Sequence, residues 1–187
     1  MIDLPGEIAI LTGPPGSGKT TAARVLADMP GSSKVHLHAD DFWHFIRNGA
    51  LAPYLPEAQE QNRVVVDALA KAAETYARGG YFVIVDGIVG PWFLEPFEAL
   101  AAPLHYIVLR PALEAAIWRC RERGGDTLTD RGTIEALWRQ FSALGELERH
   151  VLATEGQSRR ETLDKVVEAA KSGMFRLPHR RSEGAAS

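Results

Sequence analysis

Apolar residues along the chain gather in five short runs, each about as long as a β-strand. Several of the runs are rich in β-branched residues, which favour strands over helices. The third run is almost wholly apolar, as expected for a strand that is covered on both faces. The pattern predicts five buried strands, at Glu7–Thr12, Lys34–Ala39, Tyr81–Asp86, Leu104–Leu109 and His150–Thr154.

Helical periodicity fills the segments between these runs. In Pro56–Arg78, apolar residues recur at Val65, Leu69 and Ala73, and the two glycines after Arg78 provide a helix stop. Strands that alternate with helices predict a three-layer α/β fold, in which helices cover both faces of a parallel sheet. Further helices are predicted at Thr20–Ala27, Pro111–Arg121, Thr133–Leu144 and Ser158–Lys171, the last of them with capping-box spacing.

The composition is that of an ordinary globular protein. The 187 residues are 45% hydrophobic and 24% charged, which suits one domain over residues 1–175. The polar segment 176–187 is expected to be a disordered tail. The formal net charge of −3 argues against nucleic acid as a partner.

The sequence gives no sign of export or membrane insertion. No apolar run approaches the roughly 20 residues of a membrane span. The first residues lack the basic and apolar regions of a signal peptide. Cys120 is the only cysteine, so it has no intrachain disulfide partner, and a reducing, cytoplasmic location is expected.

The most specific motif begins where the first predicted strand ends. Glycines in such a loop turn backbone N–H groups toward phosphate oxygens, and the next helix presents its positive N-terminal end to the same anion. Lys19 is expected to reach the β- and γ-phosphates of ATP. The phosphate-binding residues are predicted to be Gly13, Pro14, Pro15, Gly16, Ser17, Gly18, Lys19, Thr20 and Thr21, of which the first eight fit G-x-x-x-x-G-K-[ST] completely.

A carboxylate at the end of the third predicted strand completes a magnesium site. The strand runs YFVIVD and ends in Asp86, an apolar strand closed by an acid. Such an acid orients Mg²⁺ together with the hydroxyl of the loop threonine, here Thr20. Asp86 could also be an ordinary acid at a strand end, but its pairing with the loop favours the metal role.

The acceptor side of the site is expected after the second predicted strand. Loops that follow the carboxyl ends of parallel strands line the ligand crevice. Asp40 is predicted to act as the base or orienting group for an acceptor hydroxyl, and Asp41 either helps to bind the acceptor or caps a helix. Arg47 is a candidate for binding an anionic acceptor. Phe42, Trp43 and Trp92 either wall an apolar acceptor pocket or belong to the core.

A cluster of arginines predicts a lid at about residues 119–131. Arg119 and Arg123 share a helix face, and Gly124, Gly125 and Asp126 follow at once. Arginines neutralise charge on a transferred phosphoryl group, and closure of a lid excludes water. Arg119 and Arg123 are therefore catalytic candidates, Arg131 is a weaker one, and a basic helix end is the alternative reading.

Taken in order, these motifs resemble the small P-loop kinases, such as shikimate kinase, gluconate kinase and chloramphenicol phosphotransferase. The resemblance covers roughly residues 7–172. It implies a five-stranded parallel sheet in the order 2-3-1-4-5, contact between Asp40 and the acceptor hydroxyl, and a grip of Arg119 and Arg123 on the ATP phosphates. The chain departs from shikimate kinase at His38, where that family has an acid, and it lacks that family's glycine-rich acceptor motif after Asp86.

The predicted function is transfer of the γ-phosphoryl group of MgATP to a hydroxyl of a small molecule. A nucleoside monophosphate kinase is the first alternative, but the 40–63 region offers only Arg47 and Arg63 for an acceptor phosphate. A P-loop ATPase or a regulatory nucleotide-binding protein is the second, although the guanine motif of GTPases and the signature of ABC ATPases are absent. The identity of the acceptor, the choice between ATP and GTP, and the oligomeric state stay open.

Overall fold

The fold is built on a parallel sheet of five strands. The computed structural model describes residues 1–123 and 128–178. In these residues the sheet has the order β2-β3-β1-β4-β5, which confirms the predicted topology. The strands are β1 (Ile8–Thr12), β2 (Lys34–His38), β3 (Phe82–Asp86), β4 (Leu104–Arg110) and β5 (Val151–Ala153). β1 lies between β3 and β4, so both of its backbone edges are paired.

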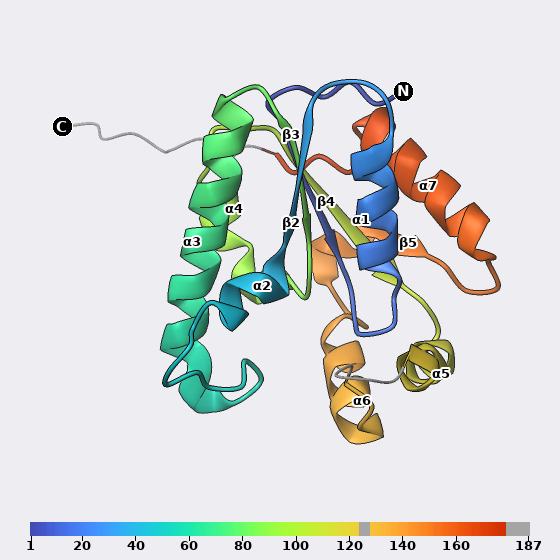
Figure 1. Cartoon of the computed structure of the whole chain (residues 1–187). Coiled ribbons are helices and arrows are strands. Elements are labelled where there is room, and N and C mark those ends of the chain that lie inside the picture. The colour runs from blue at the N-terminus through green and yellow to red at the C-terminus, as the bar shows by residue number, and fades with distance from the viewer. Residues whose placement is uncertain (124–127, 179–187) are drawn as a thin grey trace.

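Helices cover the two faces of this sheet (Figure 1). On one face, α1 (Lys19–Asp28) and α7 (Arg159–Ser172) pack over Ala9, Leu11 and Ile84. On the other, α3 (Gln59–Arg78) and α4 (Glu95–Glu98) pack over a second apolar cluster. The alternation of strand side chains between the two faces thus produces two cores, one on each side of the sheet.

Three further helices lie near the carboxyl ends of the strands, at the lower end of the sheet in Figure 1. Here lie α2 (Ala39–His44), α5 (Leu113–Arg123) and α6 (Arg131–Gln140). Three short 3₁₀ helices complete the secondary structure of the described residues, at Pro56–Ala58, Pro91–Phe93 and Gly145–His150. No helix among the described residues is both long and apolar enough to cross a membrane.

Helix boundaries differ from the predicted ones where a local cap decides them. α6 begins at Arg131 rather than Thr133, because the Asp130 side chain accepts a hydrogen bond from the Thr133 N–H. The predicted capping box is confirmed at the start of α7, between Ser158 and Glu161. Asp41 is not the cap of α2, since His38 occupies that position and Asp41 lies within the first turn.

The amino-terminal edge of the sheet is closed by the C-terminal segment. His105 is fully buried and its Nε2 lies 2.6 Å from Glu7 Oε2. Arg176 binds the other oxygen of Glu7, and the Leu177 N–H donates to the Leu104 carbonyl at 2.8 Å. Arg176 and Leu177 therefore belong to the ordered chain, past the predicted limit at 175, while residues 179–187 of the predicted tail lie outside the described residues.

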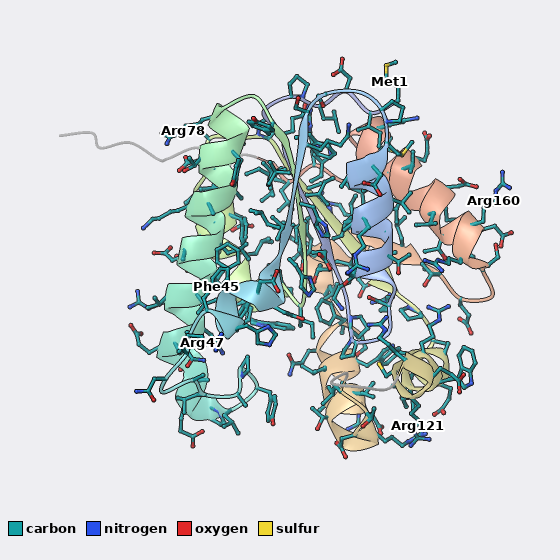
Figure 2. All side chains as sticks on the ribbon, in the orientation of Figure 1. Met1, Phe45, Arg47, Arg78, Arg121 and Arg160 are labelled. Carbon is teal, nitrogen blue, oxygen red and sulfur yellow. The ribbon has the colours of Figure 1, made fainter. Side chains whose placement is uncertain are left out.

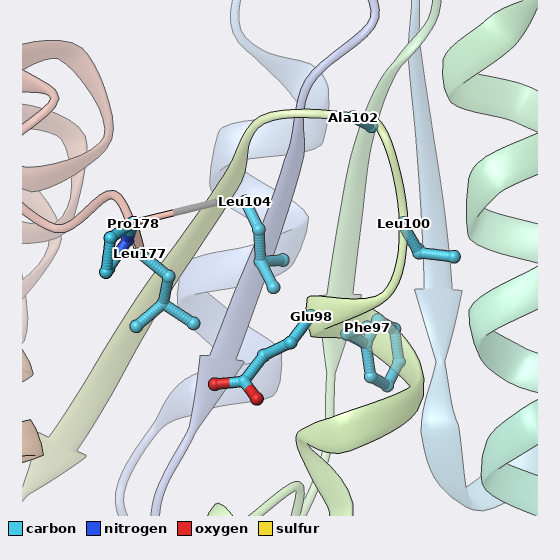
Figure 3. A pocket seen from close by; sticks show the side chains of 7 residues that line it. All are labelled: Phe97, Glu98, Leu100, Ala102, Leu104, Leu177 and Pro178. Atoms are coloured by element: carbon cyan, nitrogen blue, oxygen red, sulfur yellow. The ribbon is translucent and has the colours of Figure 1, made fainter. Parts of the chain in front are cut away.

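A small hollow marks this closed edge. Leu104 and Leu177 line it together with Phe97 and Glu98 (Figure 3). Its volume is about 10 Å³, roughly the minimum for one water molecule. The hollow is thus a packing gap beneath the returning chain and has no room for a ligand.

Candidate active site

The loop between β1 and α1 is pressed against its neighbours. Gly13 has a φ of 142°, and a Cβ there would lie 2.2 Å from the Leu109 carbonyl oxygen. Gly16 has a φ of 75°, and its Cβ would lie 2.4 Å from the Ala116 carbonyl oxygen. Only glycine fits at these two positions. The end of β4 and the start of α5 therefore form a wall that fixes the path of the loop.

The interior of this loop offers polar groups that the protein leaves unused. Ser17 is buried, and its Oγ has no hydrogen-bond partner among the described residues. α1 begins directly behind it at Lys19, with Gly18 at the N-cap and no side chain capping the helix. An orphaned hydroxyl beside an uncapped helix N-terminus suits the oxygens of an anion, so these residues fit a phosphate group.

The Lys19 side chain crosses this loop. Its Nζ donates to the Pro14 carbonyl at 3.3 Å. Burial lowers the pKa of the ammonium group, while the negative charges of Asp40 and Asp86 act in the opposite direction. The structure thus brings Lys19 into the field of both carboxylates that the sequence singled out.

Asp86 is the most densely bonded acid of the site. It is fully buried, and its Oδ2 accepts a hydrogen bond from the Thr20 hydroxyl at 2.6 Å. Its Oδ1 lies 2.6 Å from His36 Nε2 and 3.1 Å from His38 Nδ1. Burial alone would raise the pKa of Asp86, but these three hydrogen bonds hold it well below its usual range. Asp86 is therefore an ionised carboxylate next to the threonine predicted to share a metal with it.

Asp40 occupies the open side of the same edge. It lies in the first turn of α2, and its side chain is 54% exposed. Its Oδ2 is 3.7 Å from His38 Nε2, a distance for electrostatic attraction rather than a hydrogen bond. The hydrogen bond to Asp86 raises the pKa of His38, and the charges of Asp40 and Asp41 act in the same sense. His38 therefore stands between the buried and the exposed carboxylate.

The predicted aromatic wall divides between two places. Phe42 faces α3 and lines an apolar groove of about 360 Å³ together with Phe45 and Val64. Trp92 instead packs edge-on against Phe141, with ring centroids 5.5 Å apart. Trp43 and Phe93 link the two places, because their rings lie 6.1 Å apart and Phe93 also contacts Trp92. A continuous row of aromatic rings thus runs from α2 to the end of α6.

The loop between α2 and α3 is fastened back onto α3. The Asn62 side chain accepts a hydrogen bond from Trp43 Nε1 and donates to the Pro53 carbonyl. The Gln61 side chain bonds both the N–H and the carbonyl of Leu51. Arg47 lies exposed on this loop, near Phe45 (Figure 2), and makes no ion pair with any described residue. The loop holds its shape without using the Arg47 guanidinium.

The arginine-rich segment packs over the phosphate loop through α5. Arg119 Nη1 donates to the Gly16 carbonyl at 3.4 Å, and the charge of the exposed Arg123 is close enough to help lower the pKa of Lys19. Arg131 pairs with Glu114 instead. Cys120 lies in a small core with Ile117 and Ile134. The predicted hinge residues Gly124, Gly125 and Asp126 lie outside the described residues.

Two partners of the site escaped the sequence analysis. His36 was visible only as a residue of a weakly patterned strand, and His38 only as a departure from the shikimate kinase pattern, with no role in the site. Their spacing puts both on one face of β2, and the parallel register then sets His38 beside Asp86. Knowledge of the pairing between β2 and β3 was needed to find them.

Protein ligands alone do not build a metal site here. In residues 1–123 and 128–178, no group of three or more His, Cys, Asp or Glu could hold an ion. Mg²⁺ commonly takes only one or two protein oxygens and completes its shell with phosphates and water. The pair of Thr20 and Asp86, beside the loop, fits that mode of binding.

Comparison with known proteins agrees with this architecture. Residues 9–137, more than half of the chain, match the model of the family described as AAA domain. No curated protein matches the sequence.

Several solved kinases share the fold. Thymidylate kinase from Candida albicans is 15% identical over 93% of this chain and 96% of its own, with a TM-score of 0.67. A sugar kinase from Janibacter sp. is 17% identical over 89% of this chain and 97% of its own, with a TM-score of 0.65. Shikimate kinase from Acinetobacter baumannii, solved with shikimate, is 20% identical over 90% and 94%, with a TM-score of 0.63. The chain thus has the fold of the P-loop kinases.

Proposed function

The chain belongs to the AAA domain family, and from this premise we propose that it is a kinase that transfers the γ-phosphoryl group of ATP to a hydroxyl of a small molecule. One observation carries the proposal. The exposed carboxylate of Asp40 lies beside His38, His38 contacts the buried carboxylate of Asp86, and Asp86 accepts a hydrogen bond from Thr20 of the phosphate loop. Phosphoryl transfer to a hydroxyl requires a loop that holds the donor phosphates and a carboxylate close to the acceptor. Both lie here at the carboxyl ends of the strands.

In this proposal the loop binds the nucleotide. The backbone N–H groups of Gly16 and Gly18, the Ser17 hydroxyl and the start of α1 hold phosphate oxygens, and Thr21 follows in the first turn of the helix. Lys19 neutralises charge on the β- and γ-phosphates. Thr20 and Asp86 would hold Mg²⁺, which when bound supplies further neutralisation of phosphate charge.

Asp40 works on the other reactant. A carboxylate in the first turn of α2 accepts the proton of an acceptor hydroxyl or orients that hydroxyl for in-line attack. Arg119, held at the Gly16 carbonyl, and Arg123 stabilise the charge that spreads over the transferred phosphoryl oxygens. The acceptor is positioned by Asp41, Phe42, Arg47 and Trp92.

Charges on the acceptor side favour an uncharged acceptor with an apolar face. Asp40 and Asp41 are both exposed there. Of the two nearby arginines, Arg63 is already paired with Glu60, which leaves Arg47. One exposed cation does not offset two exposed carboxylates when an anion approaches. This balance disfavours a nucleoside monophosphate as the acceptor, and the aromatic row offers a surface for a planar or apolar group.

The test is ADP release from MgATP across a panel of sugars, sugar acids, nucleosides, nucleoside monophosphates and aromatic alcohols. Nucleosides and their monophosphates form matched pairs that differ in charge. We expect release only with neutral acceptors, and a loss of about 10²–10⁴-fold in Asp40→Asn. Asp41→Asn makes the same charge change one residue along α2 and, because Asp41 only helps to position the acceptor, should lower turnover much less than Asp40→Asn does.

The same assay separates the alternatives. Turnover that requires a monophosphate acceptor would overturn the charge argument and favour a nucleoside monophosphate kinase. Slow ADP release that ignores every acceptor, and is unchanged in Asp40→Asn, would favour an ATPase or a regulatory nucleotide-binding protein.

A further inference from the structure

One oxygen of the Asp86 carboxylate is held by two histidines. His36 Nε2 lies 2.6 Å and His38 Nδ1 lies 3.1 Å from Oδ1, while the Thr20 hydroxyl takes Oδ2 at 2.6 Å. Both histidines come from β2, at the edge of the sheet, where His38 pairs in register with Asp86. Two rings on one face of an edge strand thus reach across to the end of the neighbouring strand.

This arrangement fixes the direction in which Asp86 presents its oxygens. A carboxylate with donors on one oxygen only can rotate about its Cβ–Cγ bond. With two ring nitrogens on Oδ1, the carboxylate plane is set, and Oδ2 stays on the Thr20 side, next to the phosphate loop. Because Asp86 is fully buried, its carboxylate has no contact with bulk solvent.

We propose that His36 and His38 are positioning residues that set the Mg²⁺ dependence of nucleotide binding by orienting Asp86. The proposal rests on the function proposed above, in which Thr20 and Asp86 hold the metal. Groups that hydrogen-bond a metal ligand typically change metal affinity or activity by about 10–100-fold when they are removed. The ring of His38 also lies between the carboxylates of Asp86 and Asp40. Removal of the ring would leave these two negative charges with no group between them.

The geometry suggests substitutions that keep or remove one N–H at a time. The side-chain amide of asparagine matches the Nδ1 position of histidine, and that of glutamine matches Nε2. His38→Asn and His36→Gln therefore keep a donor for Asp86, whereas His38→Ala and His36→Ala remove it. His44, exposed in the last turn of α2 and without a hydrogen bond to any described residue, provides the control His44→Ala.

The readout is ADP binding by isothermal titration calorimetry over a series of Mg²⁺ concentrations. We expect the two alanine variants to need about 10–100-fold more Mg²⁺ for its half-maximal effect on ADP affinity. The amide variants and His44→Ala should stay within about threefold of wild type, a rescue that a purely structural role would not produce. ADP affinity without Mg²⁺ should be the same in all variants.

Each outcome decides between the two proposals. Wild-type Mg²⁺ dependence in both alanine variants would overturn the positioning role and leave the proposed kinase intact. A wild-type protein that does not bind ADP at all would overturn both. If an alanine variant fails to fold, His38→Gln replaces it, since it stays polar at this partly exposed position but carries its N–H one bond too far from Asp86.

Discussion

Two clusters of similar composition, each with a fully buried member, lie at opposite ends of the same sheet. At the carboxyl ends of the strands, Asp86 binds His36, His38 and Thr20. At the amino ends, Glu7 binds His105 and Arg176. In both, a histidine nitrogen lies 2.6 Å from a carboxylate oxygen. Residue types alone would give the two clusters the same role.

Their surroundings give them different roles. The Asp86 cluster adjoins the phosphate loop and the exposed Asp40, and its hydrogen bond raises the pKa of His38. The Glu7 cluster is covered by the returning chain at Leu177, and burial lowers the pKa of His105. Ligands of open α/β sheets bind at the carboxyl ends of the strands. The comparison teaches that position along the strand, more than residue type, separates a functional cluster from a structural one.

The largest expected contrast is between two lysines at these opposite ends. Lys19 crosses the phosphate loop, whereas Lys34, at the start of β2, bonds the carbonyls of Met29 and Ser32. Lys19→Ala should lower acceptor-dependent ADP release by about 10³-fold, because a preorganised charge on the transferred group is lost. Lys34→Ala should leave turnover near that of wild type and lower the melting temperature instead. Equal losses of turnover in both variants would break the comparison.

Substitution of the two carboxylates should change different properties, turnover for Asp86 and stability for Glu7. Asp86→Asn is expected to reduce Mg²⁺-dependent turnover by about 10²-fold. Glu7→Gln should lower the free energy of unfolding by about 1–3 kcal/mol, since the amide keeps only one of the two oxygens that His105 and Arg176 contact and loses the negative charge, with little change in turnover. Urea unfolding and ADP release on both variants make the test, and a loss of activity in Glu7→Gln without a loss of stability would contradict it.

Two glycines with matching backbone offer a finer test. Gly16 and Gly6 have φ of 75° and 78°, so an alanine is strained at either position by about 1–2 kcal/mol. A Cβ at Gly6 meets its nearest neighbour, the Ala77 carbonyl oxygen, at 3.4 Å, whereas one at Gly16 would displace α5 or the loop. We expect ADP affinity, measured by calorimetry, to fall about tenfold or more in Gly16→Ala only. Equal affinities in the two variants would show that the loop tolerates the displacement.

The smallest expected effect is a pair of opposite pH dependences. Burial lowers the pKa of His105 in the folded protein, so the unfolded chain takes up a proton at a higher pH than the folded one. The folded state therefore loses stability relative to the unfolded state as pH falls below about 6.5. His38 has a raised pKa, so its contribution is present below about 6.5 and is lost as pH rises through the folded-state value. We therefore expect the urea midpoint of the wild-type protein to change with pH between 5.5 and 8. The loss of stability toward low pH should disappear in His105→Asn, and the loss toward high pH should disappear in His38→Asn. Each slope is at most about 1.4 kcal/mol per pH unit.

The sequence predicts the fold well where signals are local. Strand positions follow from apolar runs such as Tyr81–Asp86, and Gly79 and Gly80 stop α3 as expected. The start of α6 was missed because it depends on one side chain, Asp130, and its bond to a backbone N–H. Such a cap competes with several equally polar neighbours, and periodicity alone does not choose among them.

The site divides in the same way. The phosphate loop is contiguous, so its residues can be named from the motif alone. The histidines on Asp86 and the contact between Trp92 and Phe141 join segments that lie about 50 residues apart. Such contacts depend on strand register and on where a helix ends. The arrangement of the acceptor side therefore becomes visible only in the folded chain.

The close approach of the phosphate loop to β4 and α5 also sets an order of assembly. The motif is synthesised before β4 and α5, yet the atoms that confine Gly13 and Gly16 belong to Leu109 and Ala116. β1 also receives its second neighbour only with β4. A nascent chain or a fragment that ends before Leu109 thus carries the whole motif without the wall that shapes it. Nucleotide capture would begin only after β4 and the start of α5 have left the ribosome.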